Sequence, residues 1–517
     1  MCSQMISRTE HTKRNIIAAV VVQIVNIVIK FVVRTIFIYT LGKEYLGVGG
    51  VFNNILTVLS LAELGLGTVI VYDMYRPISE NNETRVTQLY QFYRDVYAGI
   101  GIFIAVLGSL LIPFLGYLIT DVPNVGNIQF LYVLHLGDSV ATYFFAHSRS
   151  LLNAYQLNRI NSRNTLLMSV LKTILEIIAL IVTKSYVIYM LVQIFVTIYG
   201  GYMLDCKVKQ LFPFVKNKVE KLDGASKREI FSNAFSMMNI RISQTLINAT
   251  DNLLISAIIS TVLVGIYSNY SMITQIILTT AFLIESSMAA SVGNLCVSEG
   301  KEKKREVFAR LQYLYSCLFG TIMIFLFGLF NPFIKLWLGT DYLLSEKIVF
   351  VVVFNCYLSG IHQPVEAYIN ADGVFKHFRF KPTVEVLINF VVSIVGAKLW
   401  GIVGVFLGTT FSHVLTTLWF DPYVLYKYSF SNGLRDYFKR YFKSLMLAIV
   451  VTLITGKFMS LVTFEGIIGF IIDIVACGVA ALVFIVINTD YNNREWLKGH
   501  IKTVLKGDNI CQRKYLS

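Results

Sequence analysis

Residues 16–41 read IIAAVVVQIVNIVIKFVVRTIFIYTL, an apolar run interrupted by a few polar side chains. About 20 mostly apolar residues cross a bilayer as one helix, so this run is long enough to span. It has no small-residue cleavage site, which predicts a retained helix rather than a signal peptide. Its polar side chains recur at steps of three, four and four residues, which places them on one helix face. They are Gln23, Asn26, Lys30 and Arg34.

The composition of the whole chain agrees with that run. Of the 517 residues, 55% are hydrophobic and 15% are charged, whereas a soluble domain carries about 25% charged residues. This excludes a disordered protein, a nucleic-acid-binding domain and an ordinary cytosolic enzyme, and it predicts a polytopic membrane protein. The seven cysteines form no CxxC or Cys/His cluster, so neither a metal site nor a disulfide framework is expected.

Fourteen stretches meet the length and hydropathy that a spanning helix needs. They are 15–41, 46–72, 96–119, 127–148, 165–183, 186–204, 235–258, 264–292, 311–337, 348–370, 384–399, 401–426, 443–461 and 466–488. A turn at Trp400-Gly401 separates the eleventh from the twelfth, and these two are the closest together.

The 45 Lys and Arg residues test this count. With the N-terminus in the cytoplasm and the loops alternating, 35 cations fall in cytoplasmic segments, six in outer loops and four inside spans. This split is what the positive-inside rule expects. It predicts a multi-pass membrane protein with both termini in the cytoplasm. The formal net charge of +14 is then mainly a topology signal that faces the anionic inner leaflet.

The loops are too short for a soluble catalytic domain. No outer loop exceeds about a dozen residues, and the longer segments are all cytoplasmic. One of these, residues 80–95, has the pattern of an amphipathic helix that lies on the inner membrane surface.

A weak internal repeat relates the two halves at an offset of 218 residues. Leu46-Gly47-Val48 resembles Val264-Gly265-Ile266. The same offset maps the four polar positions of the first span onto the seventh, at Arg241, Gln244, Asn248 and Asn252. Both spans start from the cytoplasm, so the halves would be parallel copies about an axis along the membrane normal. The alternative is chance similarity between apolar helices.

Polar stripes inside the spans have two interpretations. Either they line a cavity between two halves, or they are interhelical pairs that hold the bundle together. Lys30 and Arg34 favour the cavity because no local acid pairs with them. Arg241 also favours it, although Glu63 or Asp251 offers an ion-pair partner. The other stripes are Asn53, Thr57, Ser60 and Glu63 in the second span, Tyr267, Ser268, Asn269, Ser271, Thr274 and Glu285 in the eighth, and His362, Glu366 and Asn370 in the tenth.

Other polar residues inside the spans favour the structural interpretation or fit both interpretations equally well. Lys172 and Glu176 lie one helical turn apart and can neutralise each other. Asp138 is balanced between the two interpretations. Small residues at helical spacing over 401–412 predict close helix packing. No Walker motif, GxGxxG element or Ser/His/Asp constellation occurs, so nothing argues for an enzyme.

Several stretches resemble a known family. They are Tyr45–Asn54, Ser60–Gly67, Asp251–Ser256, Val264–Tyr270, Leu336–Gly339, Ala371–Pro382 and Pro422–Tyr426. In these stretches the chain resembles the Wzx-type polysaccharide repeat-unit flippases of the multidrug/oligosaccharidyl-lipid/polysaccharide exporter superfamily. The resemblance implies an all-α integral membrane fold with two parallel six-helix bundles around a cationic cavity and two further C-terminal helices.

The resemblance also implies a domain organisation. It places the N-terminal bundle in 1–204, a cytoplasmic linker in 205–232, the C-terminal bundle in 233–426, two additional helices in 427–488 and a cytoplasmic tail in 489–517. The implied substrate is undecaprenyl pyrophosphate bearing a short oligosaccharide, moved from the inner to the outer leaflet by alternating access for capsule, O-antigen or exopolysaccharide assembly. The implied partners are this lipid-linked oligosaccharide, the bilayer and other polysaccharide assembly proteins, with no nucleic acid.

The expected site follows from the cationic cavity. Substrate binding is assigned to Lys30, Arg34 and Arg241, with Gln23, Asn26, Gln244 and Asn248 beside them. No cofactor or metal is expected, but a membrane carboxylate that binds H⁺ or Na⁺ would couple transport to an ion gradient. The carboxylates considered for coupling or for the cavity wall are Glu63, Asp138, Asp251, Glu285 and Glu366.

Three alternatives remain at this point. A multidrug antiporter of the same superfamily would want an acidic cavity and usually twelve spans. A polysaccharide polymerase would be expected to have a large outer loop with catalytic cations. A structural scaffold would have no use for charged stripes inside the membrane.

Overall fold

The computed structural model is helical throughout the part of the chain that it describes. Residues 1, 64–65, 120–124, 299, 379, 431, 462–465, 491–493 and 496–517 lie outside that part. So do the side chains of 2–26, 62, 66–69, 158, 229, 233–245, 247–248, 286–291, 294, 297–298 and 375–376. Within the described residues there is no strand, which confirms the all-α fold.

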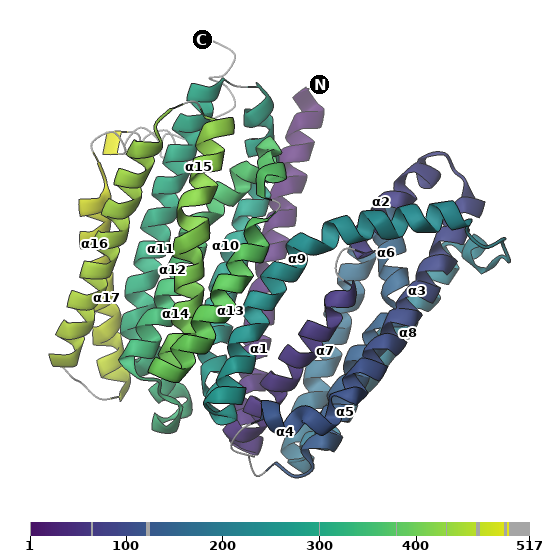
Figure 1. Ribbon diagram of the computed structural model, residues 1–517, viewed down its shortest axis with the longest axis horizontal. Helices are drawn as coiled ribbons and strands as arrows, with labels where there is room; N and C mark the ends of the chain where they lie inside the picture. The colour runs from purple at the N-terminus through teal and green to yellow at the C-terminus, as the bar shows by residue number, and fades with distance from the viewer. Residues whose placement is uncertain are drawn as a thin grey trace. The chain divides into compact units, whose positions relative to one another are not determined.

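The first half of the chain forms nine α-helices (Figure 1). They are α1 Cys2–Leu59, α2 Leu66–Ser79, α3 Glu83–Leu110, α4 Leu115–Leu118, α5 Ile128–Tyr143, α6 Ala146–Ala154, α7 Asn158–Thr183, α8 Tyr186–Leu211 and α9 Gly224–Ile258. Helix α1 kinks at Gly42, which adopts a φ of 88°. This left-handed conformation favours glycine and falls between the first two predicted spans.

The second half follows with longer helices. They are α10 Thr261–Ser298, α11 Lys301–Leu338, α12 Glu346–Asp372, α13 Lys381–Trp400, α14 Ile402–Ser412, α15 Leu418–Tyr428, α16 Leu434–Leu461 and α17 Gly466–Asn488. A π-helical segment, His413–Thr417, joins α14 to α15. Short 3-10 segments occur at Ser60–Glu63, Ile112–Phe114, Pro213–Lys216, Thr340–Tyr342 and Val374–Phe378.

Ten helical stretches in the described part are long and apolar enough to cross a membrane. They match ten of the fourteen predicted spans and confirm a multi-pass membrane protein. The remaining four predictions are 15–41, 46–72, 127–148 and 235–258. The third of these is divided, because α5 ends at Tyr143 and α6 starts at Ala146. The count of fourteen therefore stays a prediction.

The helix predicted over 80–95 is present from Glu83, but it is continuous with the following span. Its position on the membrane surface stays a prediction. The amide oxygen of Asn82 accepts a hydrogen bond from the backbone N–H of Arg85 and caps α3, which then runs unbroken to Leu110. No glycine or proline lies between the amphipathic segment and the spanning segment to break the helix. The apolar stripe of the first turns continues into the span and is buried at Val86, Tyr90 and Tyr97.

The chain divides into two compact units. Unit 1 comprises residues 1–269 and 393–405, and unit 2 comprises 270–392 and 406–517. In unit 1, α8 packs against both α5 and α7, while α1 contacts α5, α7 and α9. Gly200 and Gly201 of α8 allow these close approaches, since Met168 and Phe145 occupy the space that a Cβ would need. The domain limits expected from the resemblance stay a prediction.

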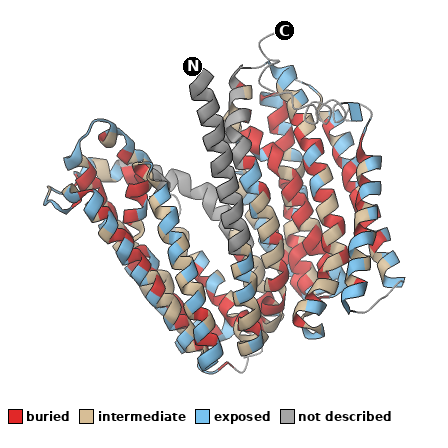
Figure 2. Ribbon diagram, turned by 180° about the vertical axis from the view of Figure 1, so that it is seen from behind, coloured by how far each residue is buried: buried red, intermediate tan, exposed pale blue. Residues whose placement is uncertain are grey.

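In unit 2, α11 packs against α12, α16 and α17. Small residues permit this packing. Gly320 lies against Phe484 of α17, Gly360 of α12 lies against Phe319 of α11, and Gly456 of α16 lies against Phe327 of α11. The buried side chains of unit 2 gather on α11 and α12, whereas α16 and α17 expose much of their surface (Figure 2).

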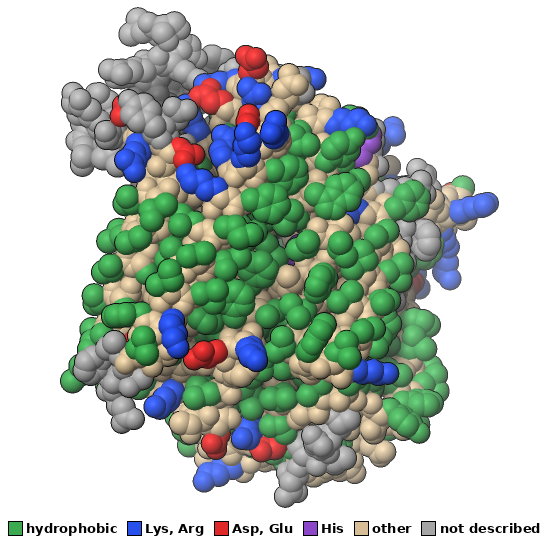
Figure 3. All heavy atoms as spheres, turned by 60° about the vertical axis from the view of Figure 1, so that its left-hand side comes forward, with side chains coloured by type: hydrophobic (Ala, Val, Ile, Leu, Met, Phe, Trp, Pro, Cys, Tyr) green, Lys and Arg blue, Asp and Glu red, His purple; other side chains and the backbone are tan. Residues whose placement is uncertain are grey.

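The exposed surface of α16 and α17 is largely apolar. Ile467, Ile468 and Leu482 of α17 and Ile454 of α16 are all more than 60% exposed. A space-filling view shows a broad band of hydrophobic side chains bordered above and below by charged ones (Figure 3). Apolar surface of this extent is stable in lipid rather than in water.

The internal repeat is supported by a backbone contact in unit 1. Gly47 and Gly265, the two glycines matched by the 218-residue offset, lie against each other. A Cβ on Gly47 would overlap the carbonyl of Thr261, and a Cβ on Gly265 would meet the carbonyl of Lys43 at 2.5 Å. Lys43 and Thr261 are themselves related by the same offset. Such reciprocal contacts are typical of a two-fold relationship.

The predicted turn at Trp400-Gly401 is confirmed. Gly401 has a φ of 60°, and the chain reverses there between α13 and α14. Gly404 of α14 then packs backbone to backbone against Gly396 of α13. The small-residue pattern over 401–412 thus allows the close packing that it predicted.

Candidate functional site

Arg34 of α1 lies at the centre of the candidate site in unit 1. Its Nε–H donates a hydrogen bond of 2.9 Å to Oδ1 of Asn269, and its Nη2 group donates to Oγ of Ser268. Both partners are on the first turns of α10, more than 230 residues away in sequence. Asn269 is fully buried and Arg34 is half-buried. Two neutral side chains therefore hold the guanidinium in place.

Lys30 lies one helical turn before Arg34 on the same face of α1, and its side chain is exposed. Among the residues that the structure describes, no carboxylate forms an ion pair with either cation. The hydrogen bonds that Arg34 donates to Asn269 and Ser268 position its guanidinium but do not neutralise it. A charge in this state, inside a membrane, needs water or an anion next to it.

The remaining expected substrate-binding residues lie on described helices, but their side chains are outside the described part of the structure. They are Gln23, Asn26, Arg241, Gln244 and Asn248. Their assignment to the cavity stays a prediction.

A polar wall next to Arg34 is built from α5, α7 and α8. Tyr189 of α8 lies close to both Arg34 and Glu176. The carboxylate of Glu176 pairs with Nζ of Lys172 at 3.8 Å, which confirms the predicted neutralisation. The hydroxyl of Thr197 donates 2.8 Å to Oδ1 of Asp138.

Lys172 and Glu176 thus form an ion pair with each other, and Asp138 accepts a hydrogen bond from a hydroxyl group. The same wall carries a second contact, between Nε2 of His135 and the hydroxyl of Tyr186 at 2.6 Å. Of the charged groups predicted in this region and described by the structure, Lys30 and Arg34 are the two without a carboxylate partner.

The other carboxylates considered for coupling lie apart from this wall. Glu63 ends the 3-10 segment after α1 and hydrogen-bonds Tyr143, with Arg149 nearby. Asp251 of α9 is half-buried. In unit 2, Glu285 of α10 is buried and lies close enough to the exposed Glu366 of α12 for their charges to repel. The structure therefore brings Glu285 and Glu366 together as a pair of acids.

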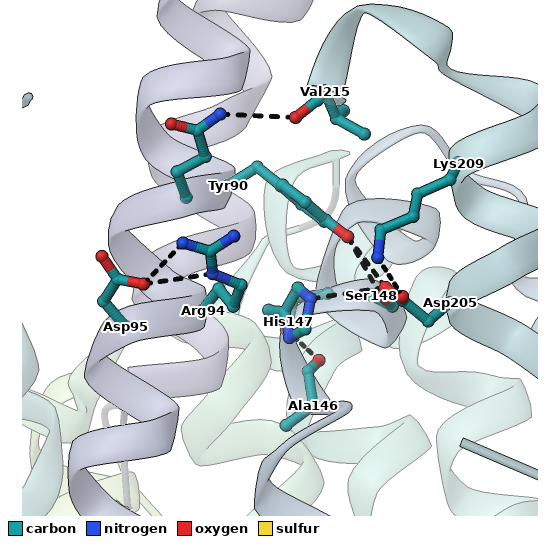
Figure 4. Close-up of polar contacts among 11 residues, drawn as sticks. Tyr90, Arg94, Asp95, Ala146, His147, Ser148, Asp205, Lys209 and Val215 are labelled. Atoms are coloured by element: carbon teal, nitrogen blue, oxygen red, sulfur yellow. Dashed lines mark hydrogen bonds and ion pairs between the residues drawn. The ribbon is translucent and has the colours of Figure 1, made fainter. Parts of the chain in front are cut away.

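Sequence reasoning missed a buried cluster around Asp205 (Figure 4). Its Oδ1 accepts hydrogen bonds from the hydroxyls of Ser148 at 2.7 Å and Tyr90 at 3.0 Å, and Nε2 of His147 lies 3.5 Å away. Its Oδ2 pairs with Nζ of Lys209 at 2.5 Å. These side chains come from α3, α6 and α8. The cluster links α3, α6 and α8 through hydrogen bonds, and the charge of Asp205 is balanced by that of Lys209.

Sequence signals for that cluster were weak. Lys209 lies one turn after Asp205, a spacing that suits a helical ion pair. The hydroxyl partners are 57 and 115 residues away, and no periodicity connects them to Asp205. Only the tertiary fold brings them together.

A second missed cluster lies in unit 2 around Asp421. Its Oδ2 lies 2.6 Å from Nζ of Lys381 and 2.9 Å from Nε2 of His362. Glu385 accepts a hydrogen bond from Thr417 at 3.1 Å and lies 3.8 Å from Lys381. The π-helical segment His413–Thr417 contributes to this cluster. Both acids lie at the ends of predicted spans, where the sequence alone assigns them to the adjoining loops.

Comparisons with known proteins agree with this architecture. Solved structures with the same fold include "Lipid II flippase MurJ, inward closed conformation", with a TM-score of 0.65, 15% identity, and coverage of 90% of this chain and 98% of that one. An inward-facing MATE family multidrug resistance transporter of the MOP superfamily matches with a TM-score of 0.60, 13% identity, and coverage of 77% and 94%. A mutant of the Vibrio cholerae MATE transporter VcmN matches with a TM-score of 0.56, 18% identity, and coverage of 80% and 95%.

These similarities define a helical membrane protein with the fold shared by a flippase and by multidrug transporters. The sequence profile described as "Polysaccharide biosynthesis protein" matches residues 12–290, more than half of the chain. The chain belongs to this polysaccharide biosynthesis family. A search of curated proteins finds no match. The matched region contains Lys30, Arg34 and the two partners of Arg34 on α10.

Proposed function

We propose that the chain moves an oligosaccharide linked to a polyprenyl pyrophosphate from the inner to the outer leaflet by alternating access, for surface polysaccharide assembly. The observation that carries this proposal is the state of Arg34. Neutral partners hold its guanidinium at 2.9 Å from Asn269 and beside Ser268, with an exposed Lys30 one turn away. Two cations that lie on one helix face without a described carboxylate partner suit a multiply anionic ligand.

The physical chemistry of the substrate supports the assignment. A pyrophosphate is costly to bring into hydrocarbon, whereas the polyprenyl chain is stable there. Charge-assisted hydrogen bonds from arginine and lysine lower the cost for the phosphates. Polar side chains near the cations hydrogen-bond the sugars, and the lipid tail stays in the bilayer. The protein supplies no covalent chemistry in this scheme and acts as a transporter rather than an enzyme.

The family and fold support the class of function. The family is that of polysaccharide biosynthesis proteins, and one structural neighbour is a lipid II flippase. In the proposal, Arg34 and Lys30 bind the pyrophosphate, with Arg241 as a third cation. Gln23, Asn26, Gln244 and Asn248 add hydrogen bonds. The protein resides in the inner membrane, with both termini in the cytoplasm and other assembly proteins as partners.

Ion coupling is assigned to the carboxylates inside the bundles. Glu285 and Glu366 are the strongest pair, because two neighbouring carboxylates favour binding of a proton or Na⁺ between them. Glu63, Asp138 and Asp251 are the other members of this set. Replacing Glu285 and Glu366 by glutamine should remove the dependence of transport on the H⁺ or Na⁺ gradient. Unchanged ion dependence in both variants would exclude this pair.

The cation site is tested by export in cells. The Lys30→Ala/Arg34→Ala variant should lose surface polysaccharide while its amount in the membrane stays the same. Lys184→Ala, which removes an exposed cation after α7, is the matched control and should export normally. Normal export by the double variant would contradict the proposal. If the parent instead exports cationic dyes and Lys30 and Arg34 are dispensable, the antiporter alternative is favoured.

A further inference from the structure

A groove of about 850 Å³ separates the ends of α7 and α8 that the predicted topology assigns to the cytoplasmic side. It belongs entirely to unit 1 and lies apart from Arg34, at the opposite end of α7 from Lys184. Asn164 of α7 bonds the carbonyl of Gly200 on α8 at 3.2 Å, so the two helices are in direct contact just below it. The groove is therefore a feature of a fixed helix pair.

Three cations line this groove. Arg159 and Arg163 lie one turn apart on α7, and Lys207 lies on α8. All three side chains are exposed, and no acid is among the lining residues. Cations one turn apart on a helix repel each other, so an anion bound between them would relieve that cost.

The neighbouring cation of α8, Lys209, differs from these three because it has an acid partner. Lys209 lies only two residues from Lys207 but pairs with Asp205 at 2.5 Å, in the cluster of Figure 4. No described carboxylate forms an ion pair with Arg159, Arg163 or Lys207. The groove therefore carries about three unbalanced positive charges on one face of the helix pair.

Apolar side chains line the same groove and continue along the helices toward the membrane interior. Leu167 of α7 is 54% exposed, and Tyr202 and Met203 of α8 are 59% and 43% exposed. Cations at the helix end, with a tyrosine and aliphatic groups one to two turns further in, match the profile of a lipid at the interface. The headgroup is anionic and the acyl chains are apolar.

We propose that this groove binds an anionic phospholipid of the inner leaflet. Arg159, Arg163 and Lys207 bind its phosphate, and Leu167 and Met203 contact its acyl chains. Basic grooves between membrane helices on the cytoplasmic side have the chemistry that phosphate headgroups require. Such a lipid would stabilise the contact between α7 and α8 by binding to the folded state. This assignment does not depend on the transported substrate.

The test measures lipid binding to the purified full-length protein by native mass spectrometry. The probes are phosphatidylglycerol and phosphatidylcholine. The groove variant is Arg159→Gln/Arg163→Gln/Lys207→Gln. The control variant, Lys216→Gln/Lys218→Gln/Lys221→Gln, removes three exposed cations from the next cytoplasmic segment. Because the groove variant loses every cation that contacts the headgroup, its phosphatidylglycerol affinity should fall by about tenfold to a hundredfold, while that of the control stays unchanged.

Further arms separate the outcomes. Phosphatidylcholine should bind at least about tenfold more weakly than phosphatidylglycerol, and inorganic phosphate should not displace the lipid. The charge-conserving Arg159→Lys/Arg163→Lys variant should keep most of the affinity, which guards against a folding defect in the glutamine variant. Alkylation of Cys206, which lines the groove, should slow when phosphatidylglycerol is added. Equal phosphatidylglycerol affinity in the groove and control variants, or displacement by inorganic phosphate, would overturn the proposal.

Discussion

Two charged regions of unit 1 differ in how their charge is balanced. Asp205 is buried among donors on three helices and has a lysine at 2.5 Å. Arg34 is held by Asn269 and Ser268, and no described acid neutralises it. The first region gains stability from a complete set of partners. The second keeps a net charge at a cost in stability, which is the signature of a site shaped for a ligand.

The largest effect on stability is expected at Asp205. Asp205→Ala should lower the free energy of unfolding in detergent by about 3 kcal/mol, because Tyr90, Ser148 and Lys209 lose their common acceptor. Transport per folded molecule should stay near that of the parent. Thermal unfolding of the purified protein measures the first quantity. Asp95→Ala is the control, since the Arg94–Asp95 pair is exposed and should contribute little. An equal shift in both variants would remove the distinction between the two regions.

The positioning of Arg34 is tested by changing a residue that accepts its hydrogen bond. Asn269→Ala leaves the charge in place but removes the 2.9 Å hydrogen bond that orients the guanidinium. A bond to a charged group is worth enough to lower the transport rate at limiting substrate by about tenfold. Rates of lipid-linked oligosaccharide transport in proteoliposomes measure this effect. Thr279→Ala, further along the same helix, removes an exposed hydroxyl that bonds the carbonyl of Gln275 and should be neutral. A normal rate in Asn269→Ala would show that Arg34 needs no positioning.

A smaller effect is expected at Lys209. Lys209→Ala removes the cation from the Asp205 cluster but leaves the hydroxyl donors in place. The lysine is 42% exposed, so solvent screens the pair and the loss should be about 1 kcal/mol. Chemical denaturation monitored by tyrosine fluorescence would detect it. A loss as large as that of Asp205→Ala would mean that the ion pair, rather than the hydroxyl groups, stabilises the cluster.

The smallest effect on stability is expected at Asp223, an exposed carboxylate that, like Asp205, accepts hydrogen bonds and lies near a cation. Asp223 caps α9, and hydrogen bonds from the side chain and backbone of Ser226, with Arg85 at 3.6 Å, lower its pKa to about 2. A lowered pKa means that the contribution is complete above the unfolded pKa and is lost as the pH falls toward about 2.

The stability difference between the parent and Asp223→Ala should therefore be constant from about pH 5 to about pH 8 and shrink below about pH 4. A difference that instead grows on acidification would contradict the sign of this pKa shift. Asp205 and Asp223 are both carboxylates with hydrogen-bond donors and a cation nearby, so the comparison contrasts a buried carboxylate with an exposed one.

Sequence reasoning succeeded where one helix contains the whole signal. Apolar length predicted α11, α13 and α17, and the turn at Gly401 followed from a break between two apolar runs. The ion pair of Lys172 with Glu176 followed from i, i+4 spacing. In each case the partners are close in sequence, so periodicity is sufficient.

Sequence reasoning failed where the tertiary structure determines which side chains interact. The continuity of the 80–95 segment with the next span was not predicted, because amphipathic character does not reveal whether a helix continues. The sequence identified Arg34 as lacking a local acid and placed Ser268 and Asn269 in a polar stripe. Their contact could not be predicted, since Ser268 and Asn269 lie on α10 in the other half of the repeat. The Asp205 and Asp421 clusters likewise join distant helices. Side chains of these types satisfy one another only after the helices pack.

The most direct test of a substrate-binding Arg34, for which the described residues offer no acid partner, is the transport rate of Arg34→Gln. The variant is reconstituted in proteoliposomes with a lipid-linked oligosaccharide, and its thermal unfolding is measured as well. Loss of one charged contact to the pyrophosphate should slow transport by about a hundredfold, while the midpoint of unfolding stays the same or rises, because an unbalanced charge has been removed. A normal transport rate, or a loss of stability comparable to that of Asp205→Ala, would contradict the claim that the charge of Arg34 serves an anionic substrate.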